Sequence, residues 1–219
     1  MKVLITGTSK GIGRETAIKF LRNNHEVYGV DILDSKISKI EYKNYHHYIS
    51  DVSIKEKLPD IENIEILINN AGVQNSDDDI LVNLKGIINC TEKYLNKKLK
   101  SIVNLASVSA TKGAEFPEYC ASKGGVMSYT RCIAKMIAKQ GATCNSISFG
   151  GVYTELNKSV IEDNDAWRDI MNMTPLRKWC TVEEAAEWIY FVAVINKSMT
   201  AQDIIIDNGE MYNHTFVWR

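Results

Sequence analysis

The chain has 219 residues, of which 45% are hydrophobic and 24% charged, with 13 glycines and 3 prolines. This composition excludes a disordered or collagen-like protein, and the length favours one large domain spanning residues 1–219. Lysine and arginine number 26 against 27 acidic residues. The resulting formal net charge of −1 predicts no nucleic-acid partner and no attraction to an anionic membrane.

We expect neither a membrane span nor a signal peptide from this sequence. No run approaches roughly 18 apolar residues, and glycines interrupt the N-terminal segment before the apolar region of a signal peptide could form. The five cysteines and four histidines show no metal-ligand spacing, and the adjacent His46 and His47 lie in a polar, tyrosine-rich stretch. We therefore expect reduced thiols, no metal ion, no membrane partner and a cytoplasmic location.

Short β-branched runs typical of strands alternate with helical patterns along the chain. Strands are expected at residues 2–6, 26–30, 47–49, 64–68, 101–105, 142–148 and 203–206. Helical spacing of apolar residues extends over residues 12–21, 80–98 and 119–140. The alternation predicts an α/β fold with a doubly wound parallel sheet, helices on both faces and ligands at the carboxyl ends of the strands. The irregular residues 154–174 form either a mobile substrate loop or a surface loop with one helix.

A glycine-rich turn, Thr6-Gly7-Thr8-Ser9-Lys10-Gly11-Ile12-Gly13, follows the first strand and opens the first helix. Gly7 permits the tight turn, Gly11 lets a pyrophosphate approach the backbone, and Gly13 lets the helix pack closely against the strand. This context predicts a Rossmann-type dinucleotide site, although a turn without a ligand is the alternative. The expected cofactor contacts from this turn are Gly7, Ser9, Lys10, Gly11, Ile12 and Gly13.

Two aspartates at strand ends are candidates for the adenosine part of the cofactor. Asp31 lies 18 residues after Gly13, where its carboxylate can accept hydrogen bonds from the ribose hydroxyls and would repel a 2′-phosphate. Asp31 therefore favours NAD as the cofactor. Lys10 could pair with a 2′-phosphate, so NADP is the alternative. Asp51, followed by Val52, could bind the adenine amino group or be a solvated turn residue.

A tyrosine and a lysine one turn apart open the longest helical pattern. Tyr119 and Lys123 share a helix face, and a neighbouring ammonium favours the phenolate of a tyrosine whose ordinary pKa is about 10. Such a phenol can exchange a proton with an alcohol or a carbonyl. Ser107, at the end of the fifth strand, can hold a substrate oxygen beside the phenol, or it could simply form a turn there.

These residues resemble the short-chain dehydrogenase/reductase family over nearly the whole chain. The resemblance rests on the glycines 7, 11 and 13, on Asn69-Asn70-Ala71-Gly72, on Asn83, on Ser107, Tyr119 and Lys123, on the segment from Phe149 to Thr154, and on Asp207-Asn208-Gly209. It implies an NAD(P)-dependent alcohol dehydrogenase or carbonyl reductase that transfers a hydride between the nicotinamide and a secondary alcohol or ketone.

The resemblance also implies residue roles. Tyr119 would be the acid/base, Lys123 would lower its pKa and hold the nicotinamide ribose, and Ser107 would orient the substrate. Asn83 would hold a water that relays protons to Lys123, or it could be an ordinary polar helix residue. Further cofactor contacts would come from Asn70, Ala71, Gly72, Tyr119, Lys123, Val152 and Thr154. A catalytically inactive, dinucleotide-binding regulatory protein is the alternative function.

The sequence departs from the family pattern at several places. Phe149 replaces a proline, which predicts a less restrained backbone near the nicotinamide, and Asn208 replaces a glycine. The segments 51–69 and 72–83 are short, which trims the third helix and the start of the fourth.

The loop before Tyr119 suggests hypotheses about the substrate. The loop before Tyr119 carries Lys112, Glu115, Phe116 and Pro117. A polar substrate, with Lys112 pairing an anion, is one hypothesis, and a solvated lysine is the other.

We expect a homo-oligomer, dimer or tetramer, built through residues 80–98 and 119–140. The helix expected over residues 119–140 carries more apolar residues than one core-facing stripe needs. The apolar residues near the C-terminus, Met211, Tyr212, Phe216, Val217 and Trp218, should pack on the sheet or on a neighbour.

Overall fold

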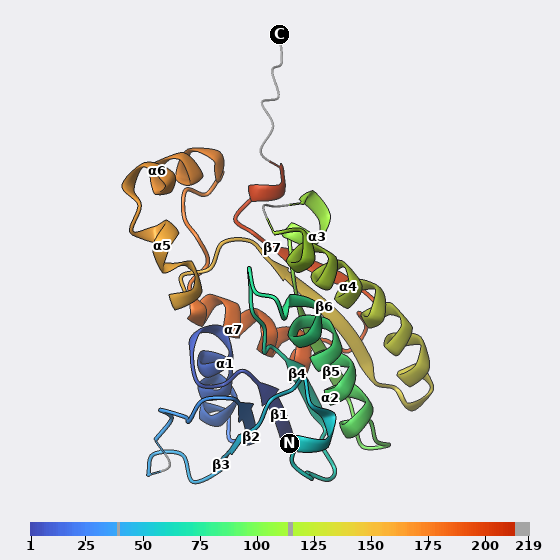
Figure 1. The fold of residues 1–219 in the computed structure, drawn as a ribbon. Coiled ribbons are helices and arrows are strands. Elements are labelled where there is room, and N and C mark those ends of the chain that lie inside the picture. The colour runs from blue at the N-terminus through green and yellow to red at the C-terminus, as the bar shows by residue number, and fades with distance from the viewer. Residues whose placement is uncertain (39, 114–115, 213–219) are drawn as a thin grey trace.

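Seven parallel strands form one sheet in the computed structural model, which describes residues 1–38, 40–113 and 116–212 (Figure 1). The strands are β1 (Lys2–Thr6), β2 (Glu26–Asp31), β3 (Tyr45–Ile49), β4 (Ile66–Asn69), β5 (Ser101–Ser107), β6 (Thr143–Phe149) and β7 (Asp203–Ile206). Their order is β3-β2-β1-β4-β5-β6-β7, and every neighbouring pair is parallel. Successive strands are added toward one edge from β1 to β3 and toward the other from β4 to β7, and a doubly wound sheet binds its ligands at this switch between β1 and β4.

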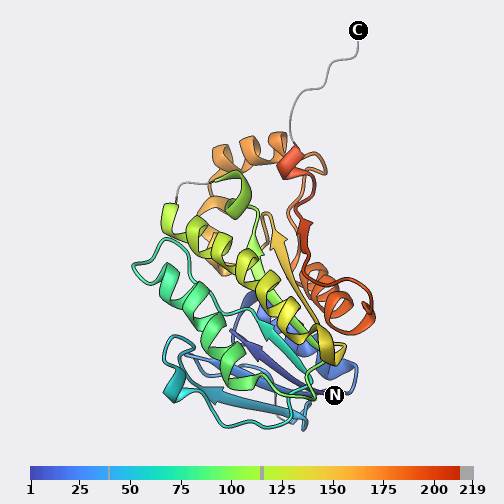
Figure 2. The same cartoon turned by 90° about the vertical axis from the view of Figure 1, so that its right-hand side faces the viewer.

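Helices cover both faces of the sheet. One face packs on α1 (Gly11–Arg22) and α7 (Val182–Tyr190), and the other on α2 (Gly86–Tyr94) and α4 (Pro117–Ile137). Figure 2 shows α2 and α4 lying side by side across the second face. Strand β1 contributes Val3 and Ile5 to the first core and Leu4 to the second, and all three are fully buried. The apolar runs of the sequence therefore correspond to strands buried on both faces, as expected for a parallel sheet.

The predicted elements agree with the structure to within a few residues, with two informative exceptions. Residues 80–98 contain a π-helical turn, η2 (Leu81–Lys85), ahead of α2, rather than one regular helix. The sequence analysis did not identify α7, although a capping box between Thr181 and Glu184 marks its start. The remaining helical segments are η1 (Lys55–Lys57), α3 (Ser109–Lys112), η3 (Ala138–Gln140), η4 (Glu155–Asn157), α5 (Lys158–Ile161), α6 (Asn164–Met173), η5 (Phe191–Ile195) and η6 (Glu210–Tyr212).

The departures from the family pattern have local explanations. Phe149 extends β6, where it pairs with Ser107 of β5 and Ile206 of β7, so the sheet restrains the backbone in place of a proline. Asn208 has φ +56°, a left-handed conformation that asparagine tolerates better than most residues. The short segment after Asp51 retains only the single turn η1. Of the apolar C-terminal residues, Phe216, Val217 and Trp218 lie outside the described part of the chain.

Within the described ranges, no helix is both long and apolar enough to span a lipid bilayer.

Candidate active site

A cleft of ≈ 1280 Å³ lies at the carboxyl ends of the strands. Its walls come from the glycine turn, the ends of β2, β4, β5 and β6, the start of α4 and the segment after Val152. Sixteen of the residues predicted from the sequence line it: Gly7, Lys10, Gly11, Ile12, Gly13, Asp31, Asp51, Val52, Asn70, Ala71, Gly72, Ser107, Tyr119, Lys123, Val152 and Thr154. Ser9 and Asn83 lie behind its surface, where both are buried.

The glycine turn has the backbone geometry that its sequence predicts. Gly7 and Gly11 have φ +75° and +53°, conformations that other residues rarely adopt. A Cβ on Gly13 would lie 2.0 Å from the Gly7 carbonyl oxygen, so only glycine lets α1 approach the turn this closely. No side chain among the described residues caps the N-terminus of α1. Its backbone N–H groups thus remain available to an anionic ligand in the cleft.

Asn70 and Thr6 brace this turn from the neighbouring strand end. The Asn70 side-chain amide donates to the carbonyl oxygens of Thr6 (2.9 Å) and Gly7 (3.0 Å). In return, the Thr6 hydroxyl accepts from the backbone N–H groups of Asn70 and Ala71, both at 3.0 Å. Asn70 therefore shapes the cradle in addition to lining it. The sequence analysis gave Thr6 no role, although it directly precedes the glycine motif.

Asp31 is held at the rim of the cleft by the turn that follows β2. Its carboxylate accepts from the backbone N–H groups of Ser9 and Leu33, both at 2.9 Å, and the Ser9 hydroxyl donates to the Leu33 carbonyl oxygen (2.9 Å). Ser9 thus ties the glycine turn to β2. The residues after Asp31 are the exposed Ile32 and Leu33, which also line the cleft and carry no charge.

The basic residue of the glycine turn is paired within the protein. Lys10 Nζ lies 3.2 Å from a carboxylate oxygen of Glu155, across the mouth of the cleft, and both side chains are largely exposed. An exposed pair of this kind contributes little stability and opens readily. Lys10 is therefore positioned at the cleft with its charge balanced by Glu155.

The turn after β3 forms the far end of the cofactor side. The Asp51 carboxylate accepts from the backbone N–H of Ser53 (2.8 Å) and lines the cleft together with the buried Val52. Behind it, the Asn89 side chain of α2 donates to the carbonyl oxygens of Val52 and Ser53, both at 3.0 Å. This turn is consequently fixed against α2 despite the shortness of the segment that follows it.

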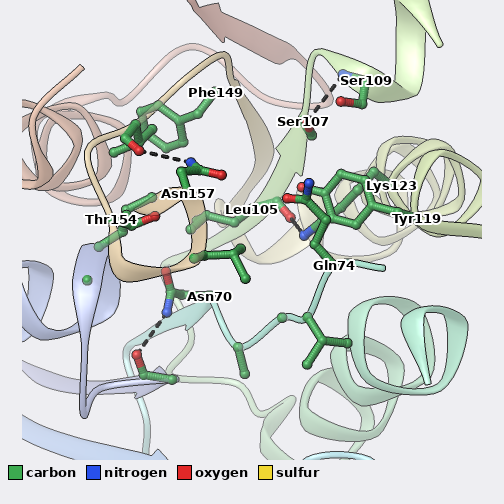
Figure 3. A pocket seen from close by; sticks show the side chains of 18 of the residues that line it. Asn70, Gln74, Leu105, Ser107, Ser109, Tyr119, Lys123, Phe149, Thr154 and Asn157 are labelled. Carbon is green, nitrogen blue, oxygen red and sulfur yellow. Dashed lines mark hydrogen bonds between the residues drawn. The ribbon is translucent and has the colours of Figure 1, made fainter. Parts of the chain in front are cut away.

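Ser107, Tyr119 and Lys123 converge on one side of the cleft (Figure 3). Lys123 is 5% exposed, its Nζ donates to the Leu105 carbonyl oxygen (2.9 Å), and it lies 5.7 Å from the centroid of the Tyr119 ring. Burial lowers the pKa of Lys123 to about 8, against an opposing effect of the Asp79 charge. The Ser107 hydroxyl accepts from the backbone N–H of Ser109 (3.2 Å), which orients it at the end of β5.

The pKa of Tyr119 is shifted in the direction opposite to the one expected from the sequence. Burial raises the pKa of Tyr119 above its usual range, and the charges of Asp79 and Cys120 act in the same direction. A hydrogen bond with Ser107 opposes this shift. The direction is opposite to the lowering expected from the adjacent ammonium, because burial favours the neutral phenol.

Asn83 lies in the π-helical turn η2, near the Lys123 ammonium. Its side-chain amide donates to the Val73 carbonyl oxygen (2.9 Å) and to the Ser122 hydroxyl (3.1 Å), and its oxygen accepts from the Val73 N–H (2.8 Å). Asn83 is fully buried. It thus fastens the segment after Gly72 to α4, and π-helical turns of this kind are frequent at functional sites.

The opposite wall contains Lys112, for which the sequence left anion pairing or solvation open, together with Glu210 and Trp179, to which the sequence analysis assigned no role. Lys112 Nζ lies 2.6 Å from a carboxylate oxygen of Glu210, and the other Glu210 oxygen accepts from the Gly151 N–H (3.2 Å). The Trp179 ring packs against Gly151, where a Cβ would lie 2.0 Å from it. The charge of Lys112 is therefore balanced within the protein. Glu115 of the same loop lies outside the described residues.

Comparison with known proteins agrees with this geometry. The model of the short chain dehydrogenase family matches residues 1–165. The chain belongs to the short-chain dehydrogenase/reductase family. It is 30% identical to the 3-oxoacyl-[acyl-carrier-protein] reductase FabG of Thermotoga maritima, over 94% of this chain and 96% of that protein.

Two solved structures match over 95–96% of this chain and 98% of their own, each with a TM-score of 0.85. They are 4-hydroxyisoleucine dehydrogenase complexed with NADH, 26% identical, and ElxO with NADP bound, 28% identical. The chain is thus a nicotinamide-dependent oxidoreductase of Rossmann-type fold, as the sequence motifs predicted.

Proposed function

We propose that the protein is an NAD-preferring short-chain alcohol dehydrogenase or carbonyl reductase that interconverts a secondary alcohol and its ketone. The observation that carries the proposal is the convergence of Ser107, Tyr119 and Lys123 at the end of a cleft whose other end is a dinucleotide cradle. The cradle fits this cofactor because a Cβ at Gly13 would collide with the Gly7 backbone and displace the turn, and because the N-terminus of α1 is uncapped by any described side chain.

The proposed roles follow from the positions of the side chains. The bound nicotinamide supplies the hydride acceptor or donor. Tyr119 exchanges the proton with the substrate oxygen, Ser107 orients that oxygen, and the Lys123 ammonium binds the nicotinamide ribose. Asn83 fixes the π-helical turn behind Lys123. The proton relay through a water at Asn83 stays a prediction.

The preference for NAD over NADP rests on Asp31 and on the pairing of Lys10 with Glu155. Asp31 is followed by the apolar Ile32 and Leu33, and Lys10 is paired with Glu155. A 2′-phosphate placed at the end of β2 would meet a carboxylate. The matched structures include both an NADH and an NADP complex, so the family likeness does not decide between them.

The substrate side is formed by residues 154–174, which we propose act as the substrate loop of a single-domain enzyme. This loop contributes Val160, Ile170 and Met173 to the cleft, which Phe116 also lines. These side chains favour an apolar group on the substrate. The Lys112–Glu210 pair at the same wall leaves the anion-pairing hypothesis for Lys112 open, because a substrate anion would compete with Glu210.

We also propose a cytoplasmic homo-oligomer. On α4, Ile133 and Ile137 are buried whereas Met136 is 64% exposed, so the helix carries an apolar side chain away from the core. An exposed apolar residue on a long helix favours contact with a second copy. Sedimentation as a monomer at all concentrations would exclude this assembly.

The experiment that tests the function compares wild type with Tyr119→Phe. NADH oxidation is measured over a broad panel of ketones, while NADH and NADPH binding is followed by nicotinamide fluorescence. We expect turnover to fall by about 10²–10⁴-fold while NADH binding persists, because only the proton donor is removed. Tyr48→Phe, on β3, is the matched control and should retain turnover. Tight NADH binding without turnover of any ketone would instead favour the regulatory alternative.

A further inference from the structure

The short segment between Gly72 and Asn83 buries a carboxylate that the proposed mechanism does not use. Of three consecutive aspartates, Asp77 and Asp78 are exposed, whereas Asp79 is only 2% exposed. The Asp79 Oδ1 atom is shielded from solvent and has no hydrogen-bond partner among the described residues. An uncompensated charge at such a position is strongly destabilising. A compensating positive charge is therefore expected nearby.

Asp79 and Asn83 lie on the same inward side of their helix. The helical run begins at Asp79, and in a π-helical turn residues four to five positions apart share one side. Asn83 is fully buried, whereas Ile80 and Leu81, between the two, are 46% and 45% exposed. The Asp79 carboxylate therefore faces the same interior as the Asn83 amide.

The Lys123 ammonium lies in that interior. A Cβ on Gly72 would lie 3.0 Å from Asn83 Oδ1 and 3.5 Å from Lys123 Nζ, so both atoms border one backbone position. The Asp79 charge opposes the lowering of the Lys123 pKa by burial, and it adds to burial in raising the pKa of Tyr119. Ser107 and Cys120 are the other groups that act on Tyr119.

We propose that Asp79 is the buried counter-ion of Lys123, a positioning residue that keeps the ammonium charged beside Tyr119. This inference rests on the proposed function, in which Lys123 acts as a cation. The shortened segment accounts for the placement, because it starts the helix four residues before Asn83 and brings Asp79 inside. Asp79 acts through Lys123, since it does not itself line the cleft.

The decisive measurement is the titration of Lys123, which requires no turnover. Protein labelled with ¹³C at the lysine Cε atoms is titrated by NMR, and the signal lost in Lys123→Met identifies Lys123. We expect Asp79→Asn to lower the pKa of Lys123 by about one unit or more. Asp77→Asn removes an exposed charge from the same tract and should leave it unchanged. An unmoved Lys123 titration in folded Asp79→Asn would overturn the proposal.

A second experiment covers the case in which Asp79→Asn does not fold. The Asp79→Asn/Lys123→Met double variant removes both charges, so recovery of folding supports the pair and persistent unfolding contradicts it. In an active enzyme, Asp79→Asn should move the whole pH profile to lower pH, because removing a negative charge lowers the pKa of both Lys123 and Tyr119. If the wild type turned over no substrate, the proposed function would fail while the Lys123 titration still tested the counter-ion.

Discussion

The two walls of the cleft are built in different ways. On the cofactor side, hydrogen bonds that involve Thr6, Asn70 and Ser9 fix the glycine turn, and a Cβ at Gly13 has no room. On the proposed substrate side, α5 and α6 bury none of their residues and stand beyond the carboxyl ends of the strands (Figure 1). The cofactor wall therefore allows few substitutions, whereas the substrate wall can change with little cost to the fold.

Among substitutions in the cofactor wall, Gly13→Ala is expected to have the largest effect on stability and NADH binding. The added methyl group meets the Gly7 carbonyl oxygen at 2.0 Å, so the backbone of the turn must shift. We expect a loss of about 2–3 kcal/mol in the free energy of unfolding and a marked loss of NADH binding. Urea unfolding and fluorescence titration measure these effects. Gly124→Ala is the matched control, because a Cβ there contacts nothing within 4 Å and helix propensity favours alanine. Equal effects of the two substitutions would refute the close-packing argument.

The buried Lys123 gives the cofactor end a distinctive dependence of stability on pH. The pKa of Lys123 is about 8 in the folded chain against an ordinary 10.5, so between these values the unfolded chain binds more protons. Stability attributable to Lys123 therefore rises with pH in this window, by on the order of 2 kcal/mol between pH 7 and 9.5. The difference in unfolding free energy between wild type and Lys123→Met, measured in urea across this range, should grow accordingly. A difference that is flat with pH would contradict the buried, neutralisable lysine.

Asp31→Asn tests the rim of the cofactor wall, where a smaller effect is expected. Without the negative charge, the repulsion of a 2′-phosphate is lost, and the preference for NADH over NADPH should fall by about tenfold, which corresponds to about 1.4 kcal/mol. The dissociation constants of both cofactors provide the readout. Asp34→Asn removes a charge from the following loop and should leave the ratio intact. No change in the ratio for Asp31→Asn would show that other residues select the cofactor.

Ile170→Ala tests the proposed substrate wall. The side chain lines the cleft from α6, a helix without buried residues, so its loss should change the midpoint of thermal unfolding very little. The KM of an apolar ketone should rise severalfold, since about 1 kcal/mol of apolar contact is removed. A large drop in thermal stability would show that α6 is more firmly packed than its exposure indicates.

The predictability of the molecule from its sequence follows the same division. The strands, α1 and the residues at strand ends were predictable because local periodicity and glycine spacing encode them. The Lys112–Glu210 pair joins residues 98 positions apart, and the packing of Trp179 on Gly151 likewise depends on tertiary structure. Which of the three aspartates is buried depends on the π-helical turn, and no local signal in the sequence marks that turn.

The strand order also has a consequence for how the chain can fold while it is being synthesised. Once β1 lies between β2 and β4, the strands β5, β6 and β7 join one edge of the sheet in the order in which they leave the ribosome. Each of them therefore emerges when its partner strand is already in place, and none has to be inserted between earlier strands. Because domains begin to fold during synthesis, an intermediate ending after β5 would already hold the glycine turn, Asp31 and Asn70 while still lacking Tyr119, Lys123 and Thr154.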